Sequence, residues 1–266
     1  YQLAIAAIRS RPGRKTVIID SANFPTDRYI LEGIAEDLGL TLITLDTDGQ
    51  GGPGAVSVSA EHERVTARAL APHLSEDVAL VTLQAINYRS GARSELAEIQ
   101  AAVTAVGAHM LWDCSHAGGA IKLDFEVNKI KLAVGCTYKY GNSGPGSPAW
   151  LFVHTDLQDE LQVPIKGWFA QEDQFVMGPW FEKARGIRGF QVASPSIVGI
   201  RGVQASYEMI QRAGIAEIEK KAAIGTDLMI QLVDEWLAPH GFTLGTPREA
   251  SHRGGHIIIN HPEAST

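Results

Sequence analysis

Residues 132–146, with the sequence LAVGCTYKYGNSGPG, carry the pattern on which the fold assignment depends. The first residues form a short apolar run that predicts a buried strand, and the last ones form a turn with several glycines. Lys139 stands between the strand and the turn, which is an unusual place for a solvated cation. A lysine amine kept from water can attack a carbonyl, and glycines let the backbone approach a bulky cofactor. The stretch therefore predicts a reactive lysine at the end of a buried strand.

Short apolar runs of the same kind alternate with longer amphipathic segments on both sides of this stretch. This alternation is typical of βαβ units around a mostly parallel sheet. The sequence predicts strands at residues 16–20, 41–45, 78–83, 109–113, 132–136 and 149–153. It predicts a glycine-rich turn at residues 48–54 and helices at residues 27–38, 61–70 and 94–106, the last two with Ser59 and Ser94 as N-caps. We therefore expect an α/β fold.

The pattern of the sequence changes near residue 200, from alternating strand-like and helical segments to nearly continuous helical periodicity. Helical periodicity runs almost unbroken over residues 197–237, and residues 255–260 then predict a strand. We expect a large domain over residues 1–200 and part of a smaller α+β domain over residues 201–266. We also expect both domains to be incomplete, because the chain opens on Tyr1 in a helical pattern and closes just after a predicted strand.

The composition bounds the class of protein. The 266 residues are 45% hydrophobic and 20% charged, which is ordinary for a globular protein with a sizeable core. The formal charge of -7 argues against nucleic acid or an anionic membrane surface as the main partner. Two cysteines make no disulfide scaffold, no apolar stretch approaches the ~18 residues of a membrane span, and no leader-like segment opens the chain. We expect a cytoplasmic protein without a nucleic-acid or membrane partner, and we predict no metal site.

A second group of chemically informative residues follows the predicted strand at residues 109–113. Asp113 closes this strand, and His116 comes three residues later. Ligands of open α/β sheets bind beyond the carboxyl ends of the strands, so Asp113 and Lys139 are expected at one site. A carboxylate there needs a cationic partner to remain ionised, and a protonated pyridine nitrogen is such a partner. These residues alone leave open that Asp113 caps a following helix.

A third group, residues 21–27 (SANFPTD), directly follows the first predicted strand. Phe24 could lie flat on an aromatic cofactor ring, and Pro25 fixes the turn. Thr26 and Asp27 are also good N-caps for the next helix, and capping is the better explanation when this segment is taken alone.

Taken together, these groups resemble kynureninase, a fold-type I enzyme of the class V aminotransferase superfamily that uses pyridoxal 5'-phosphate (PLP). The resemblance covers residues 1–263 and rests on the motifs at residues 24–27, 87–91, 112–116, 135–140, 144–146, 167–169 and 193–196. It implies a mostly parallel sheet with helices on both faces, a small C-terminal α+β domain, PLP as the cofactor, and a homodimer with shared active sites.

The resemblance also implies a role for individual residues. Lys139 would bond to PLP, Asp113 would pair with the pyridine nitrogen, and Phe24 would stack on the ring. Tyr138 would hold the phosphate and help in proton transfer. The rest of the cofactor's surroundings would be Pro25, Thr26, Asp27, Gln84 and His116, of which Gln84 stands where the family more often has Ser or Thr.

Other implied contacts lie further along the chain. Trp168 and Ser194 would reach the site of a neighbouring subunit, although a core aromatic is the alternative for Trp168, and Asn or Thr is commoner at the position of Ser194. The family also has a phosphate-binding element upstream of the first residue and a carboxylate-binding arginine downstream of the last one. Arg253 and His256 are candidate substrate contacts within the chain.

The activity implied by the resemblance is hydrolysis of L-kynurenine, or its 3-hydroxy form, to anthranilate, or 3-hydroxyanthranilate, and L-alanine in tryptophan catabolism. One alternative is another class V enzyme, a cysteine desulfurase or an aminotransferase; another is an inactive truncated homologue. Cys114 and Cys136 sit inside strand-end motifs, which argues against the mobile cysteine that a desulfurase needs. A nucleotide-binding Rossmann fold is disfavoured, because no GxGxxG motif follows the first strand.

Overall fold

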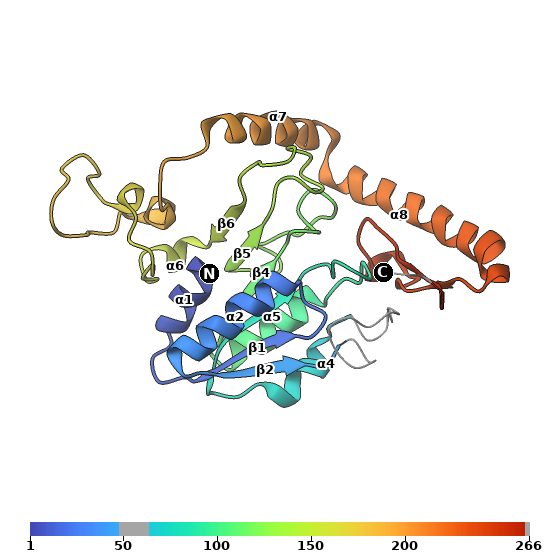
Figure 1. The fold of residues 1–266 in the computed structure, drawn as a ribbon, viewed down its shortest axis with the longest axis horizontal. Helices are drawn as coiled ribbons and strands as arrows, with labels where there is room; N and C mark the ends of the chain where they lie inside the picture. Colours follow the sequence, from blue (N-terminus) through green and yellow to red (C-terminus); the bar gives the residue numbers. More distant parts are fainter. Residues whose placement is uncertain (48–63, 264–266) are drawn as a thin grey trace.

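The computed structural model describes residues 1–47 and 64–263, and its centre is a six-stranded sheet (Figure 1). The strand order is β2-β1-β3-β4-β5-β6. Strands β1 to β5 run parallel, and β6 pairs antiparallel with β5. The strands are β1 (Thr16–Asp20), β2 (Thr41–Leu45), β3 (Val78–Gln84), β4 (His109–Asp113), β5 (Leu132–Gly135) and β6 (Trp150–Val153). The predicted mostly parallel sheet is therefore confirmed, with each strand within one residue of its expected bounds.

Helices cover both faces of this sheet, which is why β1, β3 and β4 are mostly apolar and are buried along their whole length. On one face, α1 (Gln2–Arg9) and α2 (Pro25–Leu38) share a core cluster with residues such as Ile19. On the other face, α5 (Leu96–Ala105) packs with Ile18 and Trp112, whose indole nitrogen donates to Gln100 Oε1 at 3.2 Å. The alternation of side chains along each strand thus divides the core into two layers.

The shorter helices begin at places that differ from those predicted. Ser94 does not cap α5; its hydroxyl donates to the carbonyl of Gln84 at 2.8 Å, and the helix begins at Leu96. Of the helix predicted at residues 61–70, the described part is α4 (Ala67–Leu70), capped by Thr66. The predicted N-cap Ser59 and the predicted turn at residues 48–54 lie outside the described residues.

The chain beyond β6 consists mostly of helices. Two long ones, α7 (Ile197–Ala213) and α8 (Ile215–Leu232), meet at Gly214, whose φ of 81° breaks the helical path that the sequence predicted as almost continuous. They form a long arm across the top of the view in Figure 1. The shorter turns are α6 (Thr155–Gln158), the 3-10 helices η1 (Ala71–His73), η2 (Trp168–Ala170), η3 (Gly186–Phe190), η5 (Ala238–His240) and η6 (Ala250–His252), and the π-helical η4 (Val233–Leu237).

A small second sheet lies at the C-terminal end. It pairs β7 (Thr243–Leu244) antiparallel with β8 (Ile259–Asn260). The strand predicted over residues 255–260 is therefore limited to its last two residues. The domain boundary predicted near residue 200 falls within α7 and stays a prediction. None of the helices in the described part of the chain is long and apolar enough to cross a membrane.

Two glycine substitutions test this packing in opposite directions. A Cβ added to Gly135, at the end of β5, would lie 2.5 Å from Cζ2 of the Trp150 ring in the paired strand. A Cβ added to Gly33, inside α2, would meet nothing within 4 Å. We expect Gly135→Ala to lower the free energy of unfolding by about 1–3 kcal/mol through overpacking. We expect Gly33→Ala to raise it by ~0.5–1 kcal/mol because alanine favours the helix. Urea denaturation measures both, and equal effects would contradict this description of the β5–β6 edge.

Candidate active site

Lys139 lies in the loop that leaves β5, and this loop is held firmly on both sides. Thr137 Oγ1 donates to the carbonyl of Pro148 at 2.8 Å, and Ser143 N donates to the carbonyl of Thr137 at 3.1 Å. The loop that follows β4 packs directly against it, because a Cβ on Gly119 would lie 2.5 Å from the Tyr140 carbonyl oxygen. Gly119 also has a φ of 91°, so both its conformation and this close approach require glycine.

The amine of Lys139 meets two of the residues predicted to surround it. Its Nζ lies 3.4 Å from Nδ1 of His116, which follows β4, and 5.5 Å from the ring centroid of Phe24, which follows β1. The second distance is within the range of a cation–π interaction. Three segments that are distant in sequence therefore converge on this amine, because β1, β4 and β5 are parallel and end at the same edge of the sheet.

His116 is in its neutral form at neutral pH. Burial lowers its pKa to about 4, and electrostatic interactions with Lys139 and His256 act in the same direction. A neutral imidazole has one unprotonated ring nitrogen, so Nδ1 of His116 can accept a hydrogen bond from the Lys139 ammonium group.

Asp113 is 6% exposed at the carboxyl end of β4. Its Oδ1 accepts a hydrogen bond from Ser115 N at 2.8 Å, and its Oδ2 accepts none from the described residues. Residues 114–121 form turns and not a helix, so the alternative of a helix cap is wrong. Asp113 is thus a buried carboxylate with one oxygen left for a cationic partner.

Asp27 lies in the first turn of α2 and is affected by Asp113. Its pKa is raised to about 7, first by burial and then by the negative charges of Asp113 and Asp20, against the opposing effect of the amino terminus and Lys139. Neither Asp27 nor its neighbour Thr26 caps α2; the N-cap residue is Phe24, which makes no capping bond through its side chain.

Gln84 and Asn87 tie the Phe24 segment to the loop after β3. The amide nitrogens of both side chains donate to the carbonyl of Ala22 at 3.2 Å, and Gln84 Oε1 accepts from Tyr88 N at 3.1 Å. Both ends of the Gln84 amide are therefore bonded to backbone. Its predicted contact with the cofactor stays a prediction.

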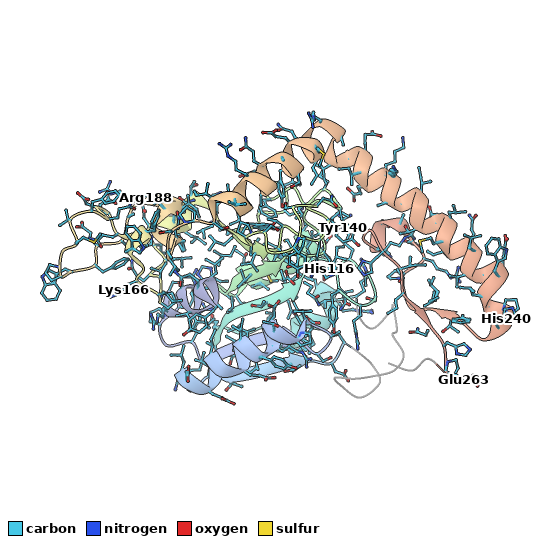
Figure 2. All side chains as sticks on the ribbon, turned by 45° about the horizontal axis from the view of Figure 1, so that its top comes forward. His116, Tyr140, Lys166, Arg188, His240 and Glu263 are labelled. Atoms are coloured by element: carbon cyan, nitrogen blue, oxygen red, sulfur yellow. The ribbon has the colours of Figure 1, made fainter. Side chains whose placement is uncertain are left out.

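A cavity of about 480 Å³ opens beside the lysine. It is lined by Tyr88, His116, Lys139, Tyr140, Asn142 and His256. Figure 2 shows His116 and Tyr140 at the centre of the molecule, beside the edge of the large sheet. Sequence reasoning gave no individual role to Tyr88, Tyr140 or Asn142, although two of them stand within three residues of Lys139 and Tyr88 belongs to a quoted motif. Their positions near Lys139 and within the motif at residues 87–91 were the signals in the sequence that could have identified them.

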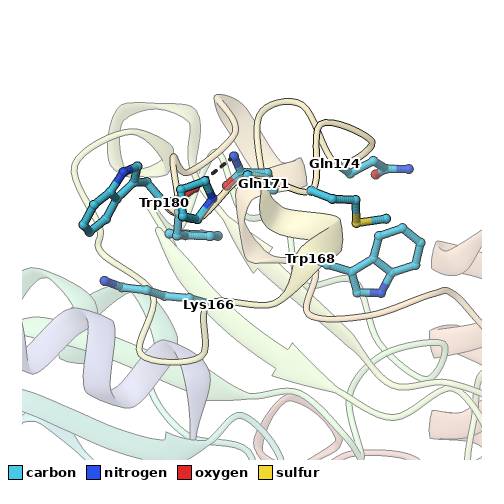
Figure 3. Close-up of a pocket in the computed structure, with 9 residues that line it drawn as sticks. Lys166, Trp168, Gln171, Gln174 and Trp180 are labelled. Carbon is cyan, nitrogen blue, oxygen red and sulfur yellow. Dashed lines mark hydrogen bonds between the residues drawn. The ribbon is translucent and has the colours of Figure 1, made fainter.

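Three of the predicted site residues lie in more open surroundings. Tyr138 is 52% exposed, with its ring centroid 5.8 Å from Lys139 Nζ. Trp168 lines a separate cavity of about 330 Å³ with Lys166 and Trp180 (Figure 3). Ser194 is exposed in the segment before α7. Trp168 and Ser194 do not line the Lys139 cavity of their own chain. Their predicted contact with the active site of a second subunit stays a prediction.

Arg253 does not fit the candidate role of a substrate contact. Its guanidinium group is fully enclosed, donates to Thr226 Oγ1 at 2.9 Å and pairs with Asp227, both on α8. It also bonds to the carbonyl of Arg248. These donors hold the C-terminal segment to α8, whereas His256, three residues later, does line the Lys139 cavity.

The raised pKa of Asp27 predicts a pH-dependent stability. The folded pKa of about 7 exceeds the reference value of 3.8, so the folded protein holds this proton more tightly and its stability falls as pH rises between those values. Asp27→Asn mimics the protonated form. It should raise the melting temperature of the cofactor-free protein at pH 8 and have much less effect at pH 4, whereas exposed Asp37→Asn on the same helix is the control. A shift of the same size at both pH values would contradict the assignment.

Comparisons with known proteins find the same resemblance to kynureninases that the sequence motifs indicate. A family model described as "Kynureninase C-terminal domain" matches residues 218–266. Curated kynureninases of Pseudomonas fluorescens and Deinococcus radiodurans are 34% and 31% identical over 263 and 261 residues, in each case 98% of this chain. The chain spans 58% and 59% of these relatives, so it covers less than two thirds of their length.

Solved structures share the fold at low sequence identity. An apo cysteine desulfurase from Thermococcus onnurineus NA1 has a TM-score of 0.73 at 18% identity, covering 97% of this chain and 61% of its own. The cysteine desulfurase CsdA from Escherichia coli has 0.76 at 14%, covering 98% and 60%. An alanine–glyoxylate aminotransferase from Nostoc has 0.65 at 17%, covering 99% and 64%. By sequence this chain is therefore similar to curated kynureninases along 98% of its length, and by architecture it has the fold of fold-type I PLP enzymes.

Proposed function

We propose that this chain carries the active site of a kynureninase. The reaction is PLP-dependent hydrolysis of L-kynurenine, or of its 3-hydroxy form, to anthranilate, or 3-hydroxyanthranilate, and L-alanine. The observation that carries the proposal is the convergence of Lys139, His116 and Phe24 at one edge of the sheet, in a chain 34% identical to a curated kynureninase. Tryptophan catabolism in the cytoplasm is the setting proposed for this activity.

The chemistry of the site fits PLP. The Lys139 amine can hold the cofactor's aldehyde carbon, and the ring of Phe24, 5.5 Å from that amine, can stack on a planar ring. The free oxygen of Asp113 can pair with a protonated pyridine nitrogen, which would also relieve the cost of its burial. When bound, PLP supplies an electron sink for charge that develops at the substrate Cα.

Proton transfer is the task of the chain's own residues. With substrate and PLP bound, a free Lys139 amine would be the base that takes the Cα proton. Neutral His116 accepts a hydrogen bond from this amine at 3.4 Å and so keeps it aimed at the cavity. Tyr138 would return a proton to the product and hold the cofactor phosphate; the distance of 5.8 Å between its ring centroid and Lys139 Nζ supports this proposal. Water adds at the side-chain ketone before the carbon–carbon bond breaks.

The remaining site residues hold these groups in place or serve a second subunit. Asp27 adds a titratable carboxyl beside Asp113. Pro25, Thr26 and Gln84 would complete the surroundings of the cofactor, and Gln84 also holds the Phe24 segment through the carbonyl of Ala22. We propose a homodimer in which Trp168 and Ser194 reach the neighbouring active site, because neither lines the cavity of its own chain. The large and small domains meet near residue 200 in this proposal.

The two cysteines give no support to desulfurase chemistry. Cys114 is fully buried, and burial raises the pKa of its thiol, so the reactive thiolate is disfavoured. Cys136 lies in the strand-end motif, with its thiol 3.7 Å from the carbonyl of Ser115. Each cysteine directly follows a strand, Cys114 after β4 and Cys136 after β5, so the sheet anchors both positions.

The activity itself is tested by release of anthranilate from L-kynurenine, followed by fluorescence. Because the chain spans 58% of the Pseudomonas relative, the assay uses it joined to that protein's flanking segments as well as alone. We expect the joined protein to cleave kynurenine and Lys139→Ala to abolish cleavage, with Lys129→Ala as the matched control. A joined protein that binds PLP but releases sulfide from cysteine and no anthranilate would contradict the proposal.

Asp113→Asn tests the pairing with the pyridine nitrogen. The variant should still bind PLP through Lys139 but lose most of the electron-withdrawing effect of the protonated ring. We expect turnover of kynurenine to fall at least about a hundredfold, equivalent to losing ~3 kcal/mol of transition-state stabilisation. Near-normal turnover with weaker PLP retention would show that Asp113 only positions the cofactor.

A further inference from the structure

Tyr140 and His256 are hydrogen-bonded in the wall of the Lys139 cavity, although they are far apart in sequence. The Tyr140 hydroxyl lies 3.1 Å from Nδ1 of His256. Tyr140 directly follows Lys139, whereas His256 comes from the segment between η6 and β8. The hydrogen bond therefore joins the lysine loop to the C-terminal part of the chain.

The segment that carries His256 is itself fixed in place. Gly254 N donates to the carbonyl of Gly91 at 2.8 Å, and Arg93 N donates to the carbonyl of His252 at 2.8 Å. The buried Arg253 ties the same segment to α8. There is little spare room, since a Cβ on Gly91 would lie 2.7 Å from the His256 carbonyl oxygen. His256 thus rests on a rigid support and can fix Tyr140 in turn.

The protonation states favour one direction for this hydrogen bond. Burial raises the pKa of Tyr140, so its hydroxyl keeps the proton. Burial also lowers the pKa of His256; the backbone of Arg89 and Tyr88 opposes this shift, and the charge of Lys139 adds to it. A neutral His256 accepts a hydrogen bond from the Tyr140 hydroxyl at Nδ1 and carries its own proton on the buried Nε2.

Tyr140 and His256 line the part of the cavity that lies away from Phe24 and Asp113, two of the proposed cofactor contacts. The His116 ring centroid is 5.6 Å from that of His256 and 6.4 Å from that of Tyr140. Phe24 and Asp113, which would hold the cofactor, do not line this cavity, whereas Tyr88, Asn142 and the pair do. Aromatic side chains in such a wall suit a flat aryl group.

We propose that Tyr140 and His256 are positioning residues that orient the aryl side chain of the amino-acid substrate beside Lys139. Their hydrogen bond holds the two rings as one fixed wall, so the substrate does not have to order them when it binds. This inference rests on the proposed function, because it takes the substrate to be an aryl-substituted amino acid.

Matched variants in the joined, PLP-loaded protein separate this role from a structural one. Tyr140→Phe removes the hydroxyl and keeps the ring. His256→Asn keeps a polar atom near the position of Nδ1, whereas His256→Gln places it near Nε2 and leaves Tyr140 unpaired. Tyr29→Phe, on the exposed face of α2, is the control.

We expect Tyr140→Phe and His256→Gln each to raise the KM for kynurenine about five- to tenfold, the scale of one lost hydrogen bond, with kcat changed less than about threefold. His256→Asn should stay within about threefold of the parent in KM. The double variant Tyr140→Phe with His256→Gln should be no worse than either alone, because both remove the same interaction. PLP affinity, from its visible absorbance, and the melting temperature should remain at parental values.

Three results would overturn the inference. KM values equal to that of Tyr29→Phe would show that the wall does not orient substrate. Loss of PLP affinity or of melting temperature in proportion to the loss of activity would assign the pair a structural role alone. A parent protein that binds PLP but neither cleaves kynurenine nor changes its absorbance with it would remove the proposed function and this inference together.

Discussion

The parallel direction of β1, β3, β4 and β5 is the constraint from which the site follows. Parallel strands need helices on both faces, and each strand here is buried because α1 and α2 cover one face and α5 the other. Every loop that follows these strands leaves from the same edge of the sheet. This topology brings together four residues that are distant from one another in sequence: Phe24, Tyr88, His116 and Lys139.

Charge shapes this edge as much as topology does. Burial raises the pKa of Asp27 to about 7, and the negative charges of Asp113 and Asp20 act in the same direction. Lys139 faces two imidazoles that burial keeps neutral. The site therefore holds one set of crowded carboxyls and one set of neutral hydrogen-bond acceptors around a single amine. A cationic ring nitrogen beside Asp113 would offset the negative charge of the carboxyls, and a carbonyl carbon could bond to the Lys139 amine.

The parts of the structure that could be predicted are those fixed by local apolar pattern. The strands of the central sheet were found because each is a short apolar run, buried on both faces when central. Lys139 and Asp113 were found because a charged residue at the end of such a run is rare. Where tertiary contacts decide, prediction failed. Ser94 bonds to Gln84 and does not cap α5, and the predicted strand at residues 255–260 is limited to Ile259–Asn260, after a segment in which Gly254 N bonds to the carbonyl of Gly91.

For the same reason, the sequence could not predict the contact between Tyr140 and His256 in the wall of the Lys139 cavity. Nothing in the sequence places His256 beside Tyr140, because their contact depends on how α8 and Arg253 hold the C-terminal segment. Nor could the sequence show that the guanidinium group of Arg253 forms hydrogen bonds with residues of α8. Long-range hydrogen bonds of this kind need coordinates.

The central claim is that Lys139 is the residue that holds PLP. Borohydride reduction of the PLP-loaded protein, followed by peptide mapping, tests it most directly, because reduction fixes the cofactor on the lysine that carries it. We expect a single labelled peptide containing Lys139. A label on Lys122, Lys129 or Lys131, with Lys139 unmodified, would contradict it.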